Sequence, residues 1–202
     1  MSDPIDHLSS LFEKLPGIGP RQAQRFVQYL LRSSPSLRHE MGEAIQHLSG
    51  SVLQCNECQR FFAGTSRMCG LCANRNRDAH VLAIVAADTD VLALERSGDY
   101  RGYYFVLGGT ISLANERANH LRLSPLLAGM PARIQKGLKE IIFAFPANPE
   151  GDATAIRVHD ELDEHLPAHG LKITSLGRGL STGSELEYAD PETLKQALAS
   201  RR

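Results

Sequence analysis

Four cysteines lie within one short window of the chain, and its 202 residues contain no others. They follow the pattern C-x2-C-x10-C-x2-C, over Cys55, Cys58, Cys69 and Cys72. Two CxxC pairs at this distance supply the four thiolates that a tetrahedral zinc ion takes in proteins. A site filled by four thiolates leaves no open position for a substrate. The pattern therefore predicts a structural zinc site rather than a catalytic one.

Two other uses of paired cysteines compete with a metal site. Disulfides are typical of secreted proteins, but the sequence shows no secretory signal peptide, and cysteine makes up only 4 of 202 residues. A redox-active CxxC pair needs no duplicate ten residues further on. We therefore interpret the four cysteines as zinc ligands, and we expect Gly70 to form a tight turn that brings backbone amides toward the sulfur atoms.

A second group of residues has the chemistry to bind phosphate. The segment LPGIGP at 15–20 separates two amphipathic stretches. Gly17 and Gly19 can adopt positive φ and leave the backbone bare, while Pro20 suits the first turn of a helix. Free amides at that helix start, together with the helix dipole, favour an anion. A DNA phosphate fits such a site, and contacts of this type carry no base information.

The helix that follows the hairpin supports this interpretation. At about 100° per residue, one face is formed by Arg21, Arg25, Gln28 and Arg32. The opposite, apolar face is formed by Ala23, Phe26, Val27 and Leu30. A solvated arginine face is the alternative, but such faces usually mix signs, and no acidic residue occurs from Lys14 to His39. We expect DNA to be bound by Gly17, Gly19, Arg21, Arg25 and Arg32.

Composition sets limits on the function. Hydrophobic residues make up 42% and charged residues 22%, as in an ordinary soluble protein. No apolar run reaches the ~18 residues of a membrane span, and without targeting signals we expect the protein in the cytoplasm. The net charge of −1 argues against a general nucleic-acid coat. The charge is uneven, however, because residues 1–78 carry nine basic and seven acidic side chains.

Hydrophobic periodicity predicts helices, then a cysteine module, then alternating strands and helices. Helices are expected over 4–15, 20–32, 35–52, 91–98, 121–138 (interrupted at Pro131), 151–166 and 190–200, with Asp190 as the last N-cap. Strands are expected over 81–87, 103–107, 141–145 and 171–176. Alternation of this kind predicts a mostly parallel sheet covered by helices, in a multidomain α/β protein. The expected divisions are 1–53, 54–78, 79–176 and 177–202.

The order of these parts resembles the RecR family of bacterial recombination mediators. Besides the cysteines, the matching stretches are LPGIGPRQAQRFVQYLL at 15–31, DVLALERSGDYRGYYFVLGG at 90–109, NPEGDATA at 148–155 and GRGLSTGSELEYADPETLKQAL at 177–198. The resemblance implies a helix-hairpin-helix DNA-binding region, a four-cysteine zinc finger, a Toprim α/β domain, and a glycine-rich C-terminal motif with a short helix.

The resemblance also implies a function. The family forms ring-shaped oligomers, typically tetramers, that can encircle DNA. Its members act with RecO and RecF proteins to help load RecA onto single-stranded DNA, and they are not enzymes. The chain would therefore be a noncatalytic, nucleoid-associated DNA clamp in recombinational repair, with RecO-like and RecF-like partners.

The acidic residues of the α/β domain are the point at which the chain departs from the family. Ala86-Ala87 stand where the family has a Glu, the 148–152 segment is two residues short, and residues 112–119 replace a DGIGP-like loop. The possible acidic or partner site consists of Asp88, Asp90, Glu150 and Asp152. Magnesium needs several oxygen ligands at one point, and an Asp-x-Asp pair that opens a helix more often caps it, so we expect weak Mg2+ binding or none.

Two alternatives remain open. A Toprim-type, Mg2+-dependent nuclease or primase-like enzyme would use these acids for phosphodiester chemistry. A zinc-stabilised protein-interaction module would have no DNA role, although the acid-free stretch 14–39 argues against it.

Overall fold

The computed structural model describes residues 3–113, 121–166, 170–180 and 182–201. Of residues 112–119, which replace the DGIGP-like loop, 114–119 therefore lie outside the described residues. The chain divides into two compact units, residues 1–52 and residues 53–202. Among the helices that the structure describes, none combines the length and hydrophobicity needed to cross a bilayer.

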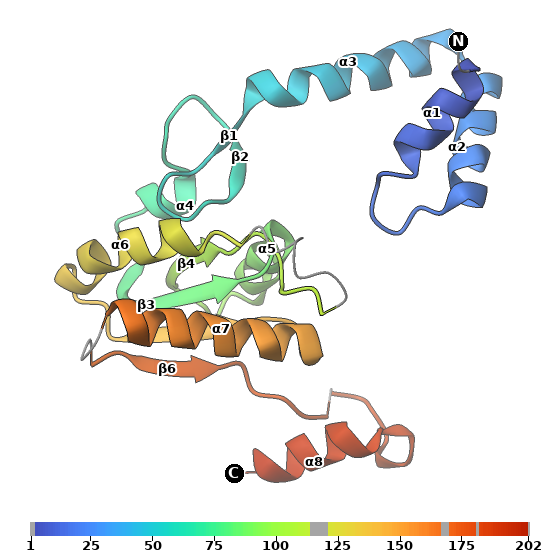
Figure 1. The fold of residues 1–202 in the computed structure, drawn as a ribbon. Helices are drawn as coiled ribbons and strands as arrows, with labels where there is room; N and C mark the ends of the chain where they lie inside the picture. Colours follow the sequence, from blue (N-terminus) through green and yellow to red (C-terminus); the bar gives the residue numbers. More distant parts are fainter. Residues whose placement is uncertain (1–2, 114–120, 167–169, 181, 202) are drawn as a thin grey trace. The chain divides into compact units, whose positions relative to one another are not determined.

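The N-terminal unit consists of three helices, which Figure 1 labels α1 (Pro4–Phe12), α2 (Pro20–Arg32) and α3 (Pro35–Ser51). A proline opens each helix, and the Asp3 and Ser34 side chains accept hydrogen bonds at the starts of α1 and α3. Helix α1 ends three residues earlier than the periodicity predicts. Leu15 precedes a proline, which disfavours helical geometry there, and residues 13–17 form turns instead.

The cysteine module opens the second unit. It contains a two-stranded sheet of β1 (Val52–Gln54) and β2 (Phe61–Ala63), followed by the short helix α4 (Gly70–Ala73). Gly70 does not form the expected tight turn: it has no positive φ and is the first residue of α4, directly after Cys69. The Cys55 amide donates to the Arg60 carbonyl oxygen over 2.9 Å, which closes the first cysteine turn.

The predicted parallel sheet is confirmed. Its strands are β3 (Asp78–Val85), β4 (Gly102–Val106), β5 (Glu140–Ala144) and β6 (Lys172–Ser175), in the spatial order β4-β3-β5-β6. Every neighbouring pair in this sheet is parallel. The intervening helices are α5 (Asp88–Ser97), α6 (Leu123–Gln135) and α7 (Pro149–His165). Helix α6 runs through Pro131 without the expected interruption, and buried Leu126 and Met130 anchor it to the core.

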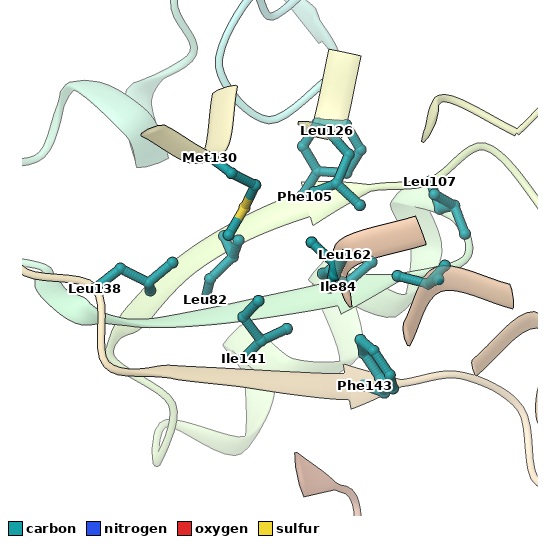
Figure 2. Close-up of a cluster of buried hydrophobic side chains, with 11 residues drawn as sticks. Leu82, Ile84, Phe105, Leu107, Leu126, Met130, Leu138, Ile141, Phe143 and Leu162 are labelled. Atoms are coloured by element: carbon teal, nitrogen blue, oxygen red, sulfur yellow. The ribbon is translucent and has the colours of Figure 1, made fainter. Parts of the chain in front are cut away.

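Alternate residues of the strands point to opposite faces, and each face has its own core. Figure 2 shows the first core, in which Leu82, Ile84 and Phe105 pack beneath α6 and α7 together with Ile141 and Phe143. The second core holds Ala83, Val85, Tyr104 and Val106, with Val91 of α5. Three of the four cysteines belong to this second core, so the sheet itself positions the cysteine cluster.

The C-terminal segment contains a 3-10 turn, η2 (Leu186–Tyr188), and the helix α8 (Pro191–Ala199). Asp190 caps α8 as the sequence predicts, with its carboxylate accepting from the Thr193 amide over 2.9 Å. The Ser200 hydroxyl donates to the Arg178 carbonyl oxygen over 2.9 Å, which holds the end of α8 beside the segment that leads into it.

Candidate metal centre and nucleic-acid interface

The ligand atoms of the four cysteines lie within 4.8 Å of one another. Cys55, Cys58 and Cys69 are at most 1% exposed, and Cys72 is partly exposed. All four thiols are free, and the Sγ atoms of Cys58 and Cys69 are 3.6 Å apart, far beyond the ~2 Å of a disulfide bond. The structure therefore contains a cluster of four sulfur ligands, and not the two disulfides of the alternative interpretation.

This donor set fits a tetrahedral metal ion. Zinc–sulfur bonds of ~2.3 Å place the sulfurs of a tetrahedral site roughly 3.8 Å from one another, close to the Cys58–Cys69 separation. The Cys69 amide also donates to the Cys55 sulfur over 3.3 Å, as expected for an amide that stabilises a thiolate. The four cysteines can hold a metal ion, and thiolates are the soft ligands that zinc accepts.

Three of the thiols have pKa values shifted in different directions by their surroundings. Hydrogen bonds, first of all from Cys72, lower the pKa of Cys58 to about 6. Burial raises the pKa of Cys69 to about 11, and the hydrogen bond to Cys58 raises the pKa of Cys72 above its ordinary value. A metal ion that binds here must displace the thiol protons that remain.

The hairpin between α1 and α2 leaves backbone open to solvent. Gly17 has a φ of 78°, as expected. The prediction of a positive φ at Gly19 is wrong, because this residue is the N-cap of α2 and its φ is −91°. A β-carbon added at either glycine would meet no atom within 4 Å. Among the described residues, the amides of Gly19 and Arg21 have no acceptor, so they are free to bind an anion.

The cationic residues of α2 lie beside this open backbone. Arg21, Arg25 and Arg32 are exposed, and no hydrogen bond or ion pair joins their side chains to another described residue. They line a shallow hollow of about 610 Å³ whose other residues are Gln24, Gln28 and Tyr29. The described residues that line the hollow therefore include three cations and no carboxylate.

The apolar face of α2 is only partly buried. Ala23 and Val27 are buried as expected, but Phe26 is 44% exposed and touches Phe12 edge to face, with ring centroids 5.8 Å apart. The unit contributes few other fully buried side chains, because α1 and α2 alone are too small to enclose a core. Much of its apolar surface thus faces outward.

The four acidic side chains expected to form a site in the α/β domain each have a different partner. Asp88 accepts from the Phe61 amide over 2.8 Å, and Asp90 accepts from the Ala87 amide over 2.8 Å at the start of α5. Glu150 lies 3.4 Å from the Leu113 amide, and Asp152 forms an ion pair with Arg178. Within the described ranges, the only group of three or more potential metal ligands is the cysteine cluster.

Three residues at these sites were not among the site residues predicted from the sequence. Arg178 pairs with Asp152 and lowers the pKa of that carboxyl. Arg122 donates to the Gln59 and Val106 carbonyl oxygens, over 2.9 and 3.2 Å, and so joins the cysteine module to the sheet. Tyr29 lies among the arginines of α2, and its position four residues after Arg25 was the signal available in the sequence.

The class of this protein is a multidomain α/β protein with three characteristic parts. They are a helix-hairpin-helix unit, a four-cysteine cluster and a Toprim-type parallel sheet. Family models agree with each part that they cover. The model for the RecR helix-hairpin-helix matches residues 5–48, the Toprim domain matches 80–176, and the RecR C-terminal model matches 179–202.

Relatives narrow the class to one family. The recombination protein RecR of Herpetosiphon aurantiacus is 39% identical over 201 residues, which cover 99% of this chain and 94% of that protein. RecR of Bifidobacterium longum subsp. infantis is 39% identical over 98% of this chain and 95% of its own length. RecR of Dehalococcoides mccartyi is 36% identical, with coverage of 98% and 93%. The chain belongs to the RecR family.

Proposed function

We propose that the chain is a noncatalytic DNA-binding clamp in recombinational repair. The observation that carries the proposal is the hollow on α2, where Arg21, Arg25 and Arg32 are exposed and lack carboxylate partners among the described residues. Membership of a family whose relatives are named recombination proteins supports it. In this role the chain acts in the cytoplasm at the nucleoid, with RecO-like and RecF-like partners, and promotes the loading of RecA onto single-stranded DNA.

The mechanism is electrostatic and mechanical. The amides near Gly17 and Gly19 and the guanidinium groups of Arg21, Arg25 and Arg32 bind phosphates and do not read bases. A single helix makes only a few such contacts, so its affinity for DNA is low and depends strongly on salt. Several copies on one DNA molecule multiply these contacts through a high effective concentration, as a clamp requires.

Exposed apolar residues support assembly into a homo-oligomer, which we propose to be a ring of four chains. The N-terminal unit leaves large side chains exposed, among them Ile5, Leu11, Leu15, Leu31, Met41, Ile45 and Leu48. Two apolar hollows of about 710 and 570 Å³ lie on this unit. Surfaces of this kind mark protein–protein contacts. Light scattering should give a mass of about four chains, and a monomer at micromolar concentration would count against the ring.

We further propose that the ion held by the cysteine cluster is zinc and that its role is structural. Cys55, Cys58, Cys69 and Cys72 fill all four positions of a tetrahedral site. Zinc supplies cross-linking of the short module, which has little core of its own. The cysteines therefore keep β1, β2 and α4 together next to the sheet.

The enzyme alternative requires the acidic residues to share one divalent cation. Asp88 and Asp90 instead accept from backbone amides, and Asp152 pairs with Arg178. We propose that Mg2+ binding is weak or absent and that the partly buried Glu150 and the exposed Asp152 serve partner docking. A cleavage assay with and without Mg2+ decides between the two roles: nicking of DNA by the wild type, lost in Asp152→Asn, would favour an enzyme.

The clamp proposal is tested by removing two arginines from the α2 hollow. Arg21→Ala/Arg25→Ala should abolish DNA retention in a mobility-shift assay while the circular dichroism spectrum stays unchanged. The matched control is Arg157→Ala/Lys172→Ala, which removes the same charge from the second unit, where both side chains already have carboxylate partners. DNA binding at the wild-type level by the α2 variant would refute the proposal.

A further inference from the structure

Tyr29 is the one aromatic residue in the hollow on α2, and 65% of its surface is exposed. It follows Arg25 by four residues and precedes Arg32 by three, so it lies on the same side of the helix as both. At 1.5 Å per residue, the Cα atom of Tyr29 lies about 6 Å along the helix axis from that of Arg25 and roughly 4.5 Å from that of Arg32. The two arginines therefore flank Tyr29 along the helix.

The tyrosines of the second unit show what a packing role looks like. Tyr104 is buried, and its hydroxyl donates to Glu95 over 2.5 Å. The Tyr100 hydroxyl donates to the Tyr103 carbonyl oxygen over 2.7 Å, and the Tyr103 hydroxyl to the Asn74 carbonyl oxygen over 3.0 Å. Tyr29 has neither property: it is exposed, and its hydroxyl has no partner among the described residues.

The other exposed tyrosine differs in its surroundings. Tyr188 is 80% exposed, but its sequence neighbours Glu185 and Glu187 are acidic and would repel a phosphate chain. Tyr29 instead lies among Arg21, Arg25 and Arg32, with no acidic residue in the hollow. Of the described tyrosines, only Tyr29 therefore combines an accessible ring with flanking cations, which is the pairing that single-stranded nucleic acid binds.

We propose that Tyr29 stacks on an unpaired base while Arg25 and Arg32 bind the phosphates on either side of that base. This inference rests on the proposed DNA-binding function and adds the substrate class, which is single-stranded DNA. In an intact duplex each base is already stacked on its neighbours, so the ring has no free base face to contact. Stacking of this type is tolerant of sequence, since every base offers a π-face.

Three substitutions at one position test the proposal. Tyr29→Ala should weaken binding to an oligothymidine about 5- to 150-fold, the range of one lost base–aromatic stack. It should leave the affinity for a blunt duplex of equal length nearly unchanged at the same salt concentration. Tyr29→Phe keeps the ring and should bind both DNAs like the wild type.

The third substitution reports on stacking directly. The chain contains no tryptophan, so Tyr29→Trp introduces a single indole whose emission should be quenched by the oligothymidine and not by the duplex. Quenching by neither DNA, or an equal loss of both affinities in Tyr29→Ala, would overturn the inference.

Failure of this inference differs from failure of the proposed function. If the wild type binds DNA and Arg21→Ala/Arg25→Ala does not, an unchanged ratio of single-strand to duplex affinity in Tyr29→Ala refutes the stacking role alone. If the wild type binds neither DNA, the proposed clamp function itself is refuted.

Tyr29 also borders the apolar hollow that contains Phe26 and Met41. If light scattering gives Tyr29→Ala a different mass from the wild type, the Tyr29 side chain lies in a contact between copies of the chain. That result would also refute stacking on a base.

Discussion

The Asp88 carboxylate accepts a hydrogen bond from the Phe61 backbone amide over 2.8 Å, which joins the start of α5 to strand β2. A second bond of 2.8 Å runs from the Val106 amide to the Cys58 carbonyl oxygen, and Arg122 adds a third link to Gln59. Three attachments thus tie the cysteine module to the ends of β3 and β4. An acidic residue that follows the central strand therefore acts in this chain as a structural anchor.

Loss of this anchor should loosen the cysteine module. We expect Asp88→Ala to lower the free energy of unfolding by about 1–3 kcal/mol, the cost of a hydrogen bond to a charged group. Bound zinc should also pass faster to a chromogenic chelator. Asp99→Ala is the control, because it removes an exposed acid that follows α5. Equal zinc-release rates in the two variants would contradict the anchoring role.

Removal of one sulfur should remove the metal. Cys58→Ser replaces the thiol whose pKa is lowered to about 6 by its neighbours. We expect elemental analysis to find less than one zinc per chain and thermal melting to begin at a lower temperature. Ser66→Ala, a substitution in the same module outside the cluster, is the control. A full zinc content in Cys58→Ser would mean that the cluster does not bind zinc through all four sulfurs.

Glu95 should make stability depend on pH. The Arg77 guanidinium, which binds it over 2.6 and 3.1 Å, and then Tyr104 hold the pKa of Glu95 below its usual range. This contribution is fully present above the unfolded-state pKa of about 4.3 and is lost as pH falls through the lower folded-state value. Glu95→Gln should therefore be less stable by about 1–3 kcal/mol at pH 7, with a smaller deficit in acid.

Urea denaturation at pH 7 and at pH values below about 4 measures this difference. Glu164→Gln, in an exposed position of α7, should track the wild type at each pH. A stability gap between Glu95→Gln and the wild type that stays constant through the acid range would show that the Glu95 charge is not responsible.

The ion pair between Arg178 and Asp152 should hold the C-terminal segment against α7. An exposed pair contributes little to global stability, so we expect Arg178→Ala to leave the melting temperature almost unchanged. Limited proteolysis between α7 and α8 should nevertheless become several times faster, as followed by mass spectrometry. Arg157→Ala breaks an equally exposed pair within α7 and should not alter cleavage. Identical cleavage rates in both variants would contradict the proposal that the Arg178–Asp152 ion pair holds the C-terminal segment.

The features that could be predicted from the sequence are those that depend on patterns of residues close together in the chain. The CxxC spacing brings the four sulfurs together, and the alternation of strands and helices gives the parallel sheet. Partners that are distant in sequence could not be predicted, such as Phe61 for Asp88 or Arg178 for Asp152. Helical periodicity also places Phe26 on a buried face, but a three-helix unit of this size has too little neighbouring chain to cover it.

Cys55, Cys58 and Cys69 share one core cluster with Val85 and Val106, so the sulfur atoms line the same apolar interior as the sheet residues. An ion bound there would be part of the hydrophobic core of the α/β domain, and not of a separate zinc finger that could detach from the sheet. In cells deprived of the metal, residues 53–202 would then be expected to unfold as a whole and to be degraded. A form with a folded sheet and an unfolded cysteine module would not accumulate.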